Sequence, residues 1–404
     1  MNKKTVTDVD FNGKKAFVRV DFNVPLSSKD PNATITVTDD TRIQAALPTL
    51  NYILDHGGAL ILASHLGRPK TADDRQFAMG PVARKLEEVT GRKVHYIPEV
   101  MSDAVKAAAA ALQPGDILLL ENTRFHPGEK KNDPQLSADF ASLADVYVDD
   151  AFGSAHRPDA SVDGAAYAMR AKGGPVVAGF LMNSEISALG VAVENPPRPY
   201  VAIMGGAKIS DKIKLIENLL DKADKILIGG GMANTFLKAQ GHKLGKSLVE
   251  EEALAEAKRL LEISGDRLIL PVDVVVADEV SPEAASEVEM VWAISPAKMA
   301  LDIGPASLER FNAELQGAQL VVWNGPMGVF EVPQFANGTN QLAQILANMV
   351  DHGAKVIIGG GDSAAAVRKA GLTEKMTHVS TGGGASLELL EGRQLPGVVA
   401  LDEK

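Results

Sequence analysis

The sequence predicts an α/β fold of two three-layer (α/β/α) domains with mostly parallel sheets. Three observations lead to this class. Short apolar runs rich in Val, Ile and Leu alternate with helical patterns along all 404 residues. The runs are apolar at consecutive positions, which is typical of parallel strands covered by helices on both faces. The length suits two domains of roughly 200 residues each.

In the first half of the chain, four apolar runs are predicted as strands. They occupy residues 16–20, 59–63, 117–120 and 146–148. Helical patterns at 81–90 and 103–112 lie between them. This order of strand and helix is typical of a doubly wound sheet.

A domain boundary is expected near residues 180–200. Gly173, Gly174 and Pro175 end the first pattern, and 182–194 is predicted as one helix that a proline-rich stretch terminates. We therefore expect a first domain at 1–180, a connecting helix and hinge at 181–199, and a second domain at 200–390.

The second half contains a further set of apolar runs. They occupy residues 201–204, 225–228, 268–270 with 272–276, 320–323 and 356–358. These runs predict a second sheet of the same kind.

Composition excludes several classes of protein. Lys and Arg number 41 against 52 Asp and Glu, a net charge of −11, which argues against a nucleic-acid carrier. Cysteine is absent, so disulfides, a thiolate nucleophile, Cys-ligated zinc and iron–sulfur clusters are excluded. The start lacks the apolar core of a signal peptide, and no apolar run approaches the roughly 18 residues of a membrane span. We therefore expect a cytoplasmic chain with no membrane partner.

Cationic side chains follow the predicted strands of the first half. In open α/β sheets, ligands bind beyond the carboxyl ends of the strands. The polar residues at those ends are Asp21, Asn23, Ser64, His65, Arg68, Glu121, Asn122, Arg124, His126, Asp149, Asp150, His156 and Arg157, and Arg42 follows the loop after the first strand. Scattered surface ion pairs, worth roughly 0–1 kcal/mol each, are the alternative. Four arginines at equivalent positions favour a pocket for a small polyanion.

Glycine-rich loops follow the predicted strands of the second half. They lie at 205–206, 229–231, 304, 325–328, 359–361 and 382–384. Glycine lets a backbone approach a ligand closely, and a following helix start offers free N–H groups to an anion. Several such loops at one edge indicate nucleotide binding, although for any single loop a tight turn is the simpler explanation.

Two formal nucleotide motifs fail. The dinucleotide fingerprint Gly-x-Gly-x-x-Gly is absent. Residues 241–247 resemble a Walker A loop but have one residue too few between the glycines and follow no strand, so we expect a surface turn.

Four charged residues in the second half suggest a ligand role. Lys208 and Lys212 would share one face of a helix opening at Ile209. Asp362 could coordinate Mg²⁺, the alternative being a helix cap with Ser363. Glu331 could accept hydrogen bonds from a ribose, the alternative being plain exposure.

Taken together, the sequence resembles the phosphoglycerate kinases over nearly its whole length. The matching stretches are VRVDFNVPL (18–26), DDTRI (39–43), SHLGRPK (64–70), ENTRFHPGEKKND (121–133), DDAFGSAHR (149–157), GGAKISDKI (205–213), GGGMANTF (229–236), WNGPMGVFE (323–331), GGGDS (359–363) and STGGGAS (380–386).

The resemblance implies two Rossmann-like domains joined by a hinge helix, with a last segment, about 391–404, that returns to the first domain. It implies reversible transfer of the acyl phosphate of 1,3-bisphosphoglycerate to Mg-ADP by a cytoplasmic monomer, in line and after domain closure. The glycerate site would be Asp21, Asn23, Arg42, His65, Leu66, Gly67, Arg68, Arg124 and Arg157. The nucleotide site would be Gly206, Ala207, Lys208, Lys212, Gly230, Gly304, Asn324, Pro326, Glu331, Gly360, Gly361, Asp362 and Ser363. Asp362 would hold Mg²⁺, and Arg42, Lys208, Gly360 and Gly361 would stabilise the transferring group.

Two departures from the family pattern stand out. The loop at 27–37 is longer than in many relatives and should only decorate the surface. Asp159 stands where a histidine is common, and should weaken one outer contact of the basic site.

Two competing functions are a dehydrogenase and a binding protein without turnover.

Overall fold

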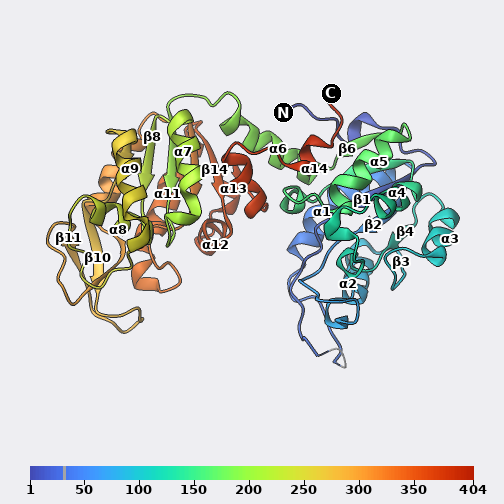
Figure 1. Ribbon diagram of the computed structural model, residues 1–404, viewed down its shortest axis with the longest axis horizontal. Coiled ribbons are helices and arrows are strands. Elements are labelled where there is room, and N and C mark those ends of the chain that lie inside the picture. Colours follow the sequence, from blue (N-terminus) through green and yellow to red (C-terminus); the bar gives the residue numbers. More distant parts are fainter. Residues whose placement is uncertain (31–32) are drawn as a thin grey trace. The chain divides into compact units, whose positions relative to one another are not determined.

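The computed structural model describes residues 1–30 and 33–404 and divides them into two compact units (Figure 1). Unit 1 comprises Met1–Ser187 and Gln394–Lys404, and unit 2 comprises Ala188–Arg393. Helix α6 (Phe180–Val193) contains the boundary between them. The predicted α/β class is confirmed, because each unit contains a six-stranded parallel sheet with helices between its strands.

The sheet of unit 1 has the strand order β3-β4-β2-β1-β5-β6, with every neighbouring pair parallel. Its strands are β1 (Lys15–Arg19), β2 (Ala59–Ala63), β3 (Val94–Tyr96), β4 (Ile117–Leu119), β5 (Val146–Asp149) and β6 (Val176–Ala178). Its helices are α1 (Thr41–Asp55), α2 (Gly80–Thr90), α3 (Asp103–Ala111), α4 (Pro134–Ser142), α5 (Ala165–Ala171) and α14 (Pro396–Val399). Strands β3 and β6 were not predicted from the sequence. Each is three residues long, and β3 includes the exposed His95, so it lacks a continuous apolar run.

Both faces of this sheet are buried, which explains the unbroken apolar runs. On one face, Val18 of β1 belongs to a core cluster with Ile43 and Leu50 of α1. On the other, the ring of Phe17 stacks on Tyr147 at 5.9 Å and lies 5.2 Å from Phe140 of α4. Successive strand residues point to opposite faces, so helices on both sides require apolar residues at every position.

The end of the chain is part of unit 1. The backbone N–H of Asp402 donates to the carbonyl of Val176 at 2.9 Å, and Lys4 N–H donates to the carbonyl of Asp402 at 2.8 Å. These bonds extend the edge of the sheet beyond β6.

The main sheet of unit 2 has the strand order β15-β14-β13-β7-β8-β9, again all parallel. Its strands are β7 (Tyr200–Met204), β8 (Lys225–Ile228), β9 (Leu268–Ile269), β13 (Leu320–Asn324), β14 (Lys355–Gly359) and β15 (His378–Val379). The helices are α7 (Ile213–Lys222), α8 (Gly230–Ala239), α9 (Leu254–Ser264), α10 (Pro305–Leu315), α11 (Asn337–Asp351), α12 (Gly361–Lys369) and α13 (Gly384–Leu390). The order in which the strands are added reverses between the neighbouring strands β7 and β13. Such sheets bind ligands at this switch point.

A second, antiparallel sheet in unit 2 corrects the sequence prediction. Strands β10 (Asp273–Ala277), β11 (Ser286–Met290) and β12 (Met299–Ile303) pair in the order β11-β10-β12. The run at 272–276 therefore does not join the parallel sheet, contrary to the expectation. Its neighbour β11 is too polar to predict as a strand, and it is exposed over its first three residues. An antiparallel sheet can have one solvent-exposed face, so its strands need not be apolar at every position.

Among the residues described, no helix combines the length and the apolar character that crossing a membrane requires.

Candidate functional site

The predicted anion site of unit 1 begins at the end of β1. Asp21 follows that strand, and Arg42 lies in the first turn of α1. Arg42 Nη1 donates to Asp21 Oδ2 at 2.7 Å, while 43% of the Arg42 side chain stays exposed. The ion pair fixes the guanidinium and leaves other donors of its planar fork for a ligand.

Residues that follow β1, β2 and β4 meet at Gly67. Gly67 N–H donates to Asn23 Oδ1 at 2.8 Å, and Arg124 Nη1 donates to the Gly67 carbonyl at 2.7 Å. Three predicted site residues from three different strand ends are thus brought together. Arg68, the next residue, is exposed.

The pKa of His65 is shifted by the positive charges that surround it. It is buried, and its pKa is held well below the usual range, first by burial and then by the charges of nearby arginines. These are Arg19, Arg124, Arg157 and Arg42, in order of decreasing effect. The imidazole is therefore neutral at pH 7, because protonation would add a cation among cations. Three of the four predicted arginines act on one side chain.

Arg19 is a member of this cluster that the sequence prediction missed. It is fully buried, its Nη2 lies 3.1 Å from His65 Nδ1, and its Nε donates to Ser161 Oγ at 2.8 Å. The residue stands inside an apolar strand run and not after it, where the site residues were expected. A lone arginine in a buried strand was the available signal, since an unpaired buried charge is costly.

Asp159 has a different place from the one predicted. It is only 5% exposed, so it is not an outer contact. Burial and Arg157 lower the pKa of Arg124, and Asp159 opposes that shift. Asp159 therefore stabilises the charge of a site arginine.

The other departure from the family pattern is the loop at 27–37. Its residues 31 and 32 lie outside the described residues.

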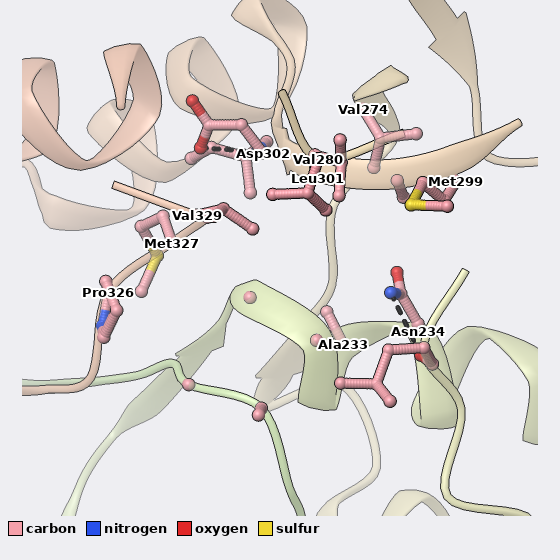
Figure 2. A pocket seen from close by; sticks show the side chains of 18 of the residues that line it. Ala233, Asn234, Val274, Val280, Met299, Leu301, Asp302, Pro326, Met327 and Val329 are labelled. Atoms are coloured by element: carbon pink, nitrogen blue, oxygen red, sulfur yellow. Dashed lines mark hydrogen bonds between the residues drawn. The ribbon is translucent and has the colours of Figure 1, made fainter. Parts of the chain in front are cut away.

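Unit 2 contains a cavity of about 490 Å³ beside the glycine-rich loops (Figure 2). Six predicted nucleotide residues line it: Gly206, Ala207, Gly230, Pro326, Glu331 and Asp362. In Figure 2, Pro326, Met327 and Val329 lie on one side and Ala233 and Asn234 of α8 on the other.

The apolar wall of this cavity was not predicted. Val274 of β10 and Met299 and Leu301 of β12 line it, together with Leu248 and Val280. These residues come from the antiparallel sheet and from loops, so no single periodic pattern marks them. Lys246, from the turn expected at 241–247, also lines the cavity.

Several glycines pack the loops against each other instead of offering N–H groups to a ligand. Gly206 N–H donates to the Pro326 carbonyl and Gly230 N–H to the Met327 carbonyl, both at 3.0 Å. A Cβ at Gly205 would lie 2.1 Å from the Pro326 oxygen. At these positions glycine lets the backbones of two loops meet where side chains would collide.

The paired lysines do not share a helix face. Helix α7 begins at Ile213, after a 3₁₀ turn at Ser210–Lys212, and Lys208 precedes both. Lys208 is exposed, whereas Lys212 Nζ donates to the Gly205 carbonyl at 2.6 Å. Burial lowers the pKa of Lys212 to about 8, against the opposing charge of Asp362.

An unpartnered amide lies at the end of β13. Asn324 is buried and its Nδ2 has no hydrogen-bond partner. A Cβ at Gly360 would lie 2.7 Å from that nitrogen, so a larger residue there would collide with the amide. An anion at the start of α12 would satisfy it.

Two other predicted residues support the backbone and lie outside the cavity lining. Ser363 Oγ is buried and accepts from Gly325 N–H at 2.5 Å. Gly304 precedes α10 as its N-cap, and its N–H donates to the Asp273 carbonyl at 3.0 Å. Gly361 opens α12 and is exposed.

Asp362 fits a magnesium ligand better than a helix cap. The N-cap of α12 is Gly360, so the capping explanation is wrong. The Asp362 carboxylate is exposed and lines the cavity. Within the described chain, no group of three or more His, Asp or Glu could hold a metal by itself. Mg²⁺ commonly binds through one or two carboxylates, water and substrate phosphates, and one exposed carboxylate suits that arrangement.

Comparison with known proteins shows the family to which the chain belongs. A family model described as phosphoglycerate kinase matches residues 6–393. Phosphoglycerate kinases from Chloroflexus aggregans and Moorella thermoacetica are each 54% identical, with all of both chains covered. The solved phosphoglycerate kinase of Coxiella burnetii has a TM-score of 0.90 at 41% identity, and that of Pyrococcus horikoshii 0.82 at 31%, each covering 98% of both chains. The chain therefore belongs to the phosphoglycerate kinase family, enzymes that reversibly transfer the acyl phosphate of 1,3-bisphosphoglycerate to ADP.

Proposed function

We propose that unit 1 binds 3-phosphoglycerate and 1,3-bisphosphoglycerate, and that unit 2 binds Mg-ADP and Mg-ATP. The observation that carries this division is the set of guanidinium groups acting on neutral His65 in unit 1. A small phosphorylated carboxylate matches a site of planar, fixed cations. Since one chain carries both sets of ligand residues, we propose that a monomer suffices.

The chemistry needs no general base. In the ATP-consuming direction, a carboxylate oxygen of 3-phosphoglycerate attacks the γ-phosphorus, and the bond from that phosphorus to the bridging oxygen of ADP breaks. The nucleophile is already ionised at pH 7, so His65 has no proton to remove. The protein's tasks are positioning and charge stabilisation.

In unit 2, the apolar wall formed by Val274, Met299 and Leu301 suits the faces of a purine base. Glu331, which lines the same cavity, would accept from the ribose hydroxyls. The N–H groups at the start of α12, with Asn324 Nδ2, would receive the phosphates. Asp362 would hold Mg²⁺, which when bound offsets charge on the phosphate oxygens.

We propose that transfer follows a closing movement of the two units, with α6 as the connection. Arg42 from unit 1 and Lys208 from unit 2 would then stabilise the charge on the migrating phosphoryl group. Gly360 and Gly361 would assist through their backbone N–H groups. Exclusion of water prevents hydrolysis of ATP and of the acyl phosphate.

The division of ligands between the units is tested with Arg157→Ala. Calorimetric titration should show 3-phosphoglycerate binding weakened about tenfold or more, because a charge-assisted contact to an anion is lost. The dissociation constant of ADP should stay within about twofold, since Arg157 belongs to unit 1. Unmodified protein must turn over ATP with 3-phosphoglycerate in a coupled assay. Equal loss of affinity for both ligands, or binding without turnover, would contradict the proposal.

The pKa of Lys212 predicts a pH dependence of nucleotide binding. A bound phosphate stabilises the ammonium and raises its pKa above about 8, so binding takes up a proton above that pH. The dissociation constant of ADP should therefore rise above about pH 8, by at most about tenfold per pH unit. Lys212→Arg should flatten this rise, because a guanidinium stays charged. Lys243→Arg, at an exposed lysine of the same unit, is the control. An unchanged slope in Lys212→Arg would exclude Lys212 as the source.

A further inference from the structure

We propose that Asn122 is a positioning residue for the glycerate site, acting through residues 65–68, which we name the anion loop. The inference rests on the proposed function of unit 1. It concerns a side chain that contacts no ligand itself and instead determines where Leu66, Gly67 and Arg124 lie.

Asn122 uses its whole hydrogen-bonding capacity on this part of the site. Its Oδ1 accepts from Leu66 N–H at 3.2 Å and from Arg124 N–H at 3.1 Å. Its Nδ2 donates to the Leu66 carbonyl at 2.7 Å and to the Phe77 carbonyl at 2.9 Å. An amide has two donors and an acceptor with two lone pairs, so every position is occupied. Asn122 is fully buried, which leaves no surface for substrate.

The pairing with Leu66 resembles one step of a β-ladder, in which a side-chain amide replaces a strand. It holds the peptide immediately before Gly67. That residue is bonded in turn by Asn23 on its N–H and by Arg124 on its carbonyl. A shift of Leu66 would therefore displace both contacts at once.

The anion loop has little freedom to find another place. Gly67 has a φ of +59°, and a Cβ there would lie 2.2 Å from the ring of Phe77. Asn122 also bonds the carbonyl of Phe77, so it holds both the loop and the residue against which the loop packs. One amide thereby maintains a close approach that only glycine allows.

Glu121 fixes the backbone that presents this amide. Its Oε1 accepts from Asn122 N–H at 2.7 Å and from Met79 N–H at 2.8 Å, and its Oε2 accepts from Tyr96 Oη–H at 2.6 Å. Glu121 is buried and has these partners on three segments. Glu121 therefore fixes the backbone of Asn122, and the Asn122 side chain in turn fixes the anion loop.

The test compares Asn122→Ala with Ser102→Ala. Ser102 caps α3 in the same unit by accepting from Val105 N–H at 3.2 Å, and its loss lowers stability without touching the site. Asn122→Ala should raise KM for the substrate 3-phosphoglycerate about tenfold to a hundredfold, since misplacing a bound substrate is that costly. KM for MgATP should stay within about twofold, and Ser102→Ala should change neither constant.

Asn122→Asp supplies a second readout that a merely structural role would not give. The substituted side chain keeps the acceptor, and when protonated it regains one donor toward the Leu66 carbonyl. Burial raises the pKa of such a carboxyl, so its KM for the substrate 3-phosphoglycerate, relative to the unmodified enzyme, should fall as pH is lowered from about 8 to 6. The same ratio for Asn122→Ala should not change with pH.

The outcomes separate clearly. Equal rises in both KM values, a loss that follows melting temperature as in Ser102→Ala, or identical pH profiles for the two Asn122 variants would overturn the positioning role. If Asn122→Ala does not fold, the near-isosteric Asn122→Asp carries both comparisons. Normal 3-phosphoglycerate binding by Arg157→Ala would instead refute the proposed function itself.

Discussion

Replacing Arg42 with alanine is expected to lower kcat about 10²–10³-fold, the usual cost of removing one preorganised donor from a transition state. The guanidinium is fixed by Asp21 at 2.7 Å and acts electrostatically on His65, so it already stands in the cationic site before substrate arrives. Its remaining donors would meet charge that grows on the phosphoryl oxygens during transfer. Such an interaction strengthens in the transition state and therefore appears in kcat.

Steady-state kinetics with each substrate varied in turn would measure this effect. KM for MgATP should stay within about twofold, because Arg42 belongs to unit 1. Arg92→Ala is the matched control. It removes an arginine of the same unit whose exposed ion pair with Asp55 spans 3.6 Å and contributes roughly 0–1 kcal/mol. An Arg42→Ala enzyme with the same kcat as the unmodified protein would refute the role assigned to this residue.

Replacing Asp362 with alanine is expected to weaken Mg-nucleotide binding about tenfold or more, the scale of losses seen when the support of a metal site is removed. The carboxylate is exposed in the first turn of α12 and does not cap the helix. Its loss should therefore cost little stability. It should also raise the Mg²⁺ concentration needed for half-maximal rate, because one oxygen ligand of the bound metal disappears.

Calorimetry with ADP, in the presence and absence of Mg²⁺, separates metal binding from simple charge. If the Asp362 carboxylate acted only as a negative charge, its removal would strengthen the binding of metal-free ADP. The dependence of nucleotide binding on Mg²⁺ would then stay unchanged. Asp351→Ala, at the exposed end of α11, is the control for net charge. An unchanged Mg²⁺ dependence in Asp362→Ala would exclude the carboxylate as a metal ligand.

The clustering of several residues predicted for the glycerate site could be anticipated from the sequence, because buried parallel strands are recognisable from short apolar runs. Runs such as 59–63 must be covered on both faces, so they are parallel strands, and the polar residues after them collect at one edge. Arg42, Arg124 and Arg157 accordingly act together on His65. The resemblance to the phosphoglycerate kinases then implied the chemistry that we propose for this edge.

The roles of individual glycines and lysines were not predictable in the same way. Gly206 and Gly230 stand in loops of the expected kind, yet their N–H groups bond the backbone of the loop after β13. Lys208 and Lys212 are four residues apart, yet a 3₁₀ turn separates them from a common helix face. In both cases a neighbour distant in sequence determines the local geometry.

The sequence alone determined the α/β class and the positions of most apolar strands along the chain, because these depend on periodicity within short segments. Only the tertiary structure decided that Arg19 contacts His65 and Asn122 bonds Leu66, that Asp159 is buried and acts on Arg124, and that the antiparallel sheet supplies part of the apolar wall of the cavity. Each of these depends on which buried groups meet across separate strand ends. Burial and hydrogen bonding result from contacts between separate segments, so they cannot be deduced from any one segment.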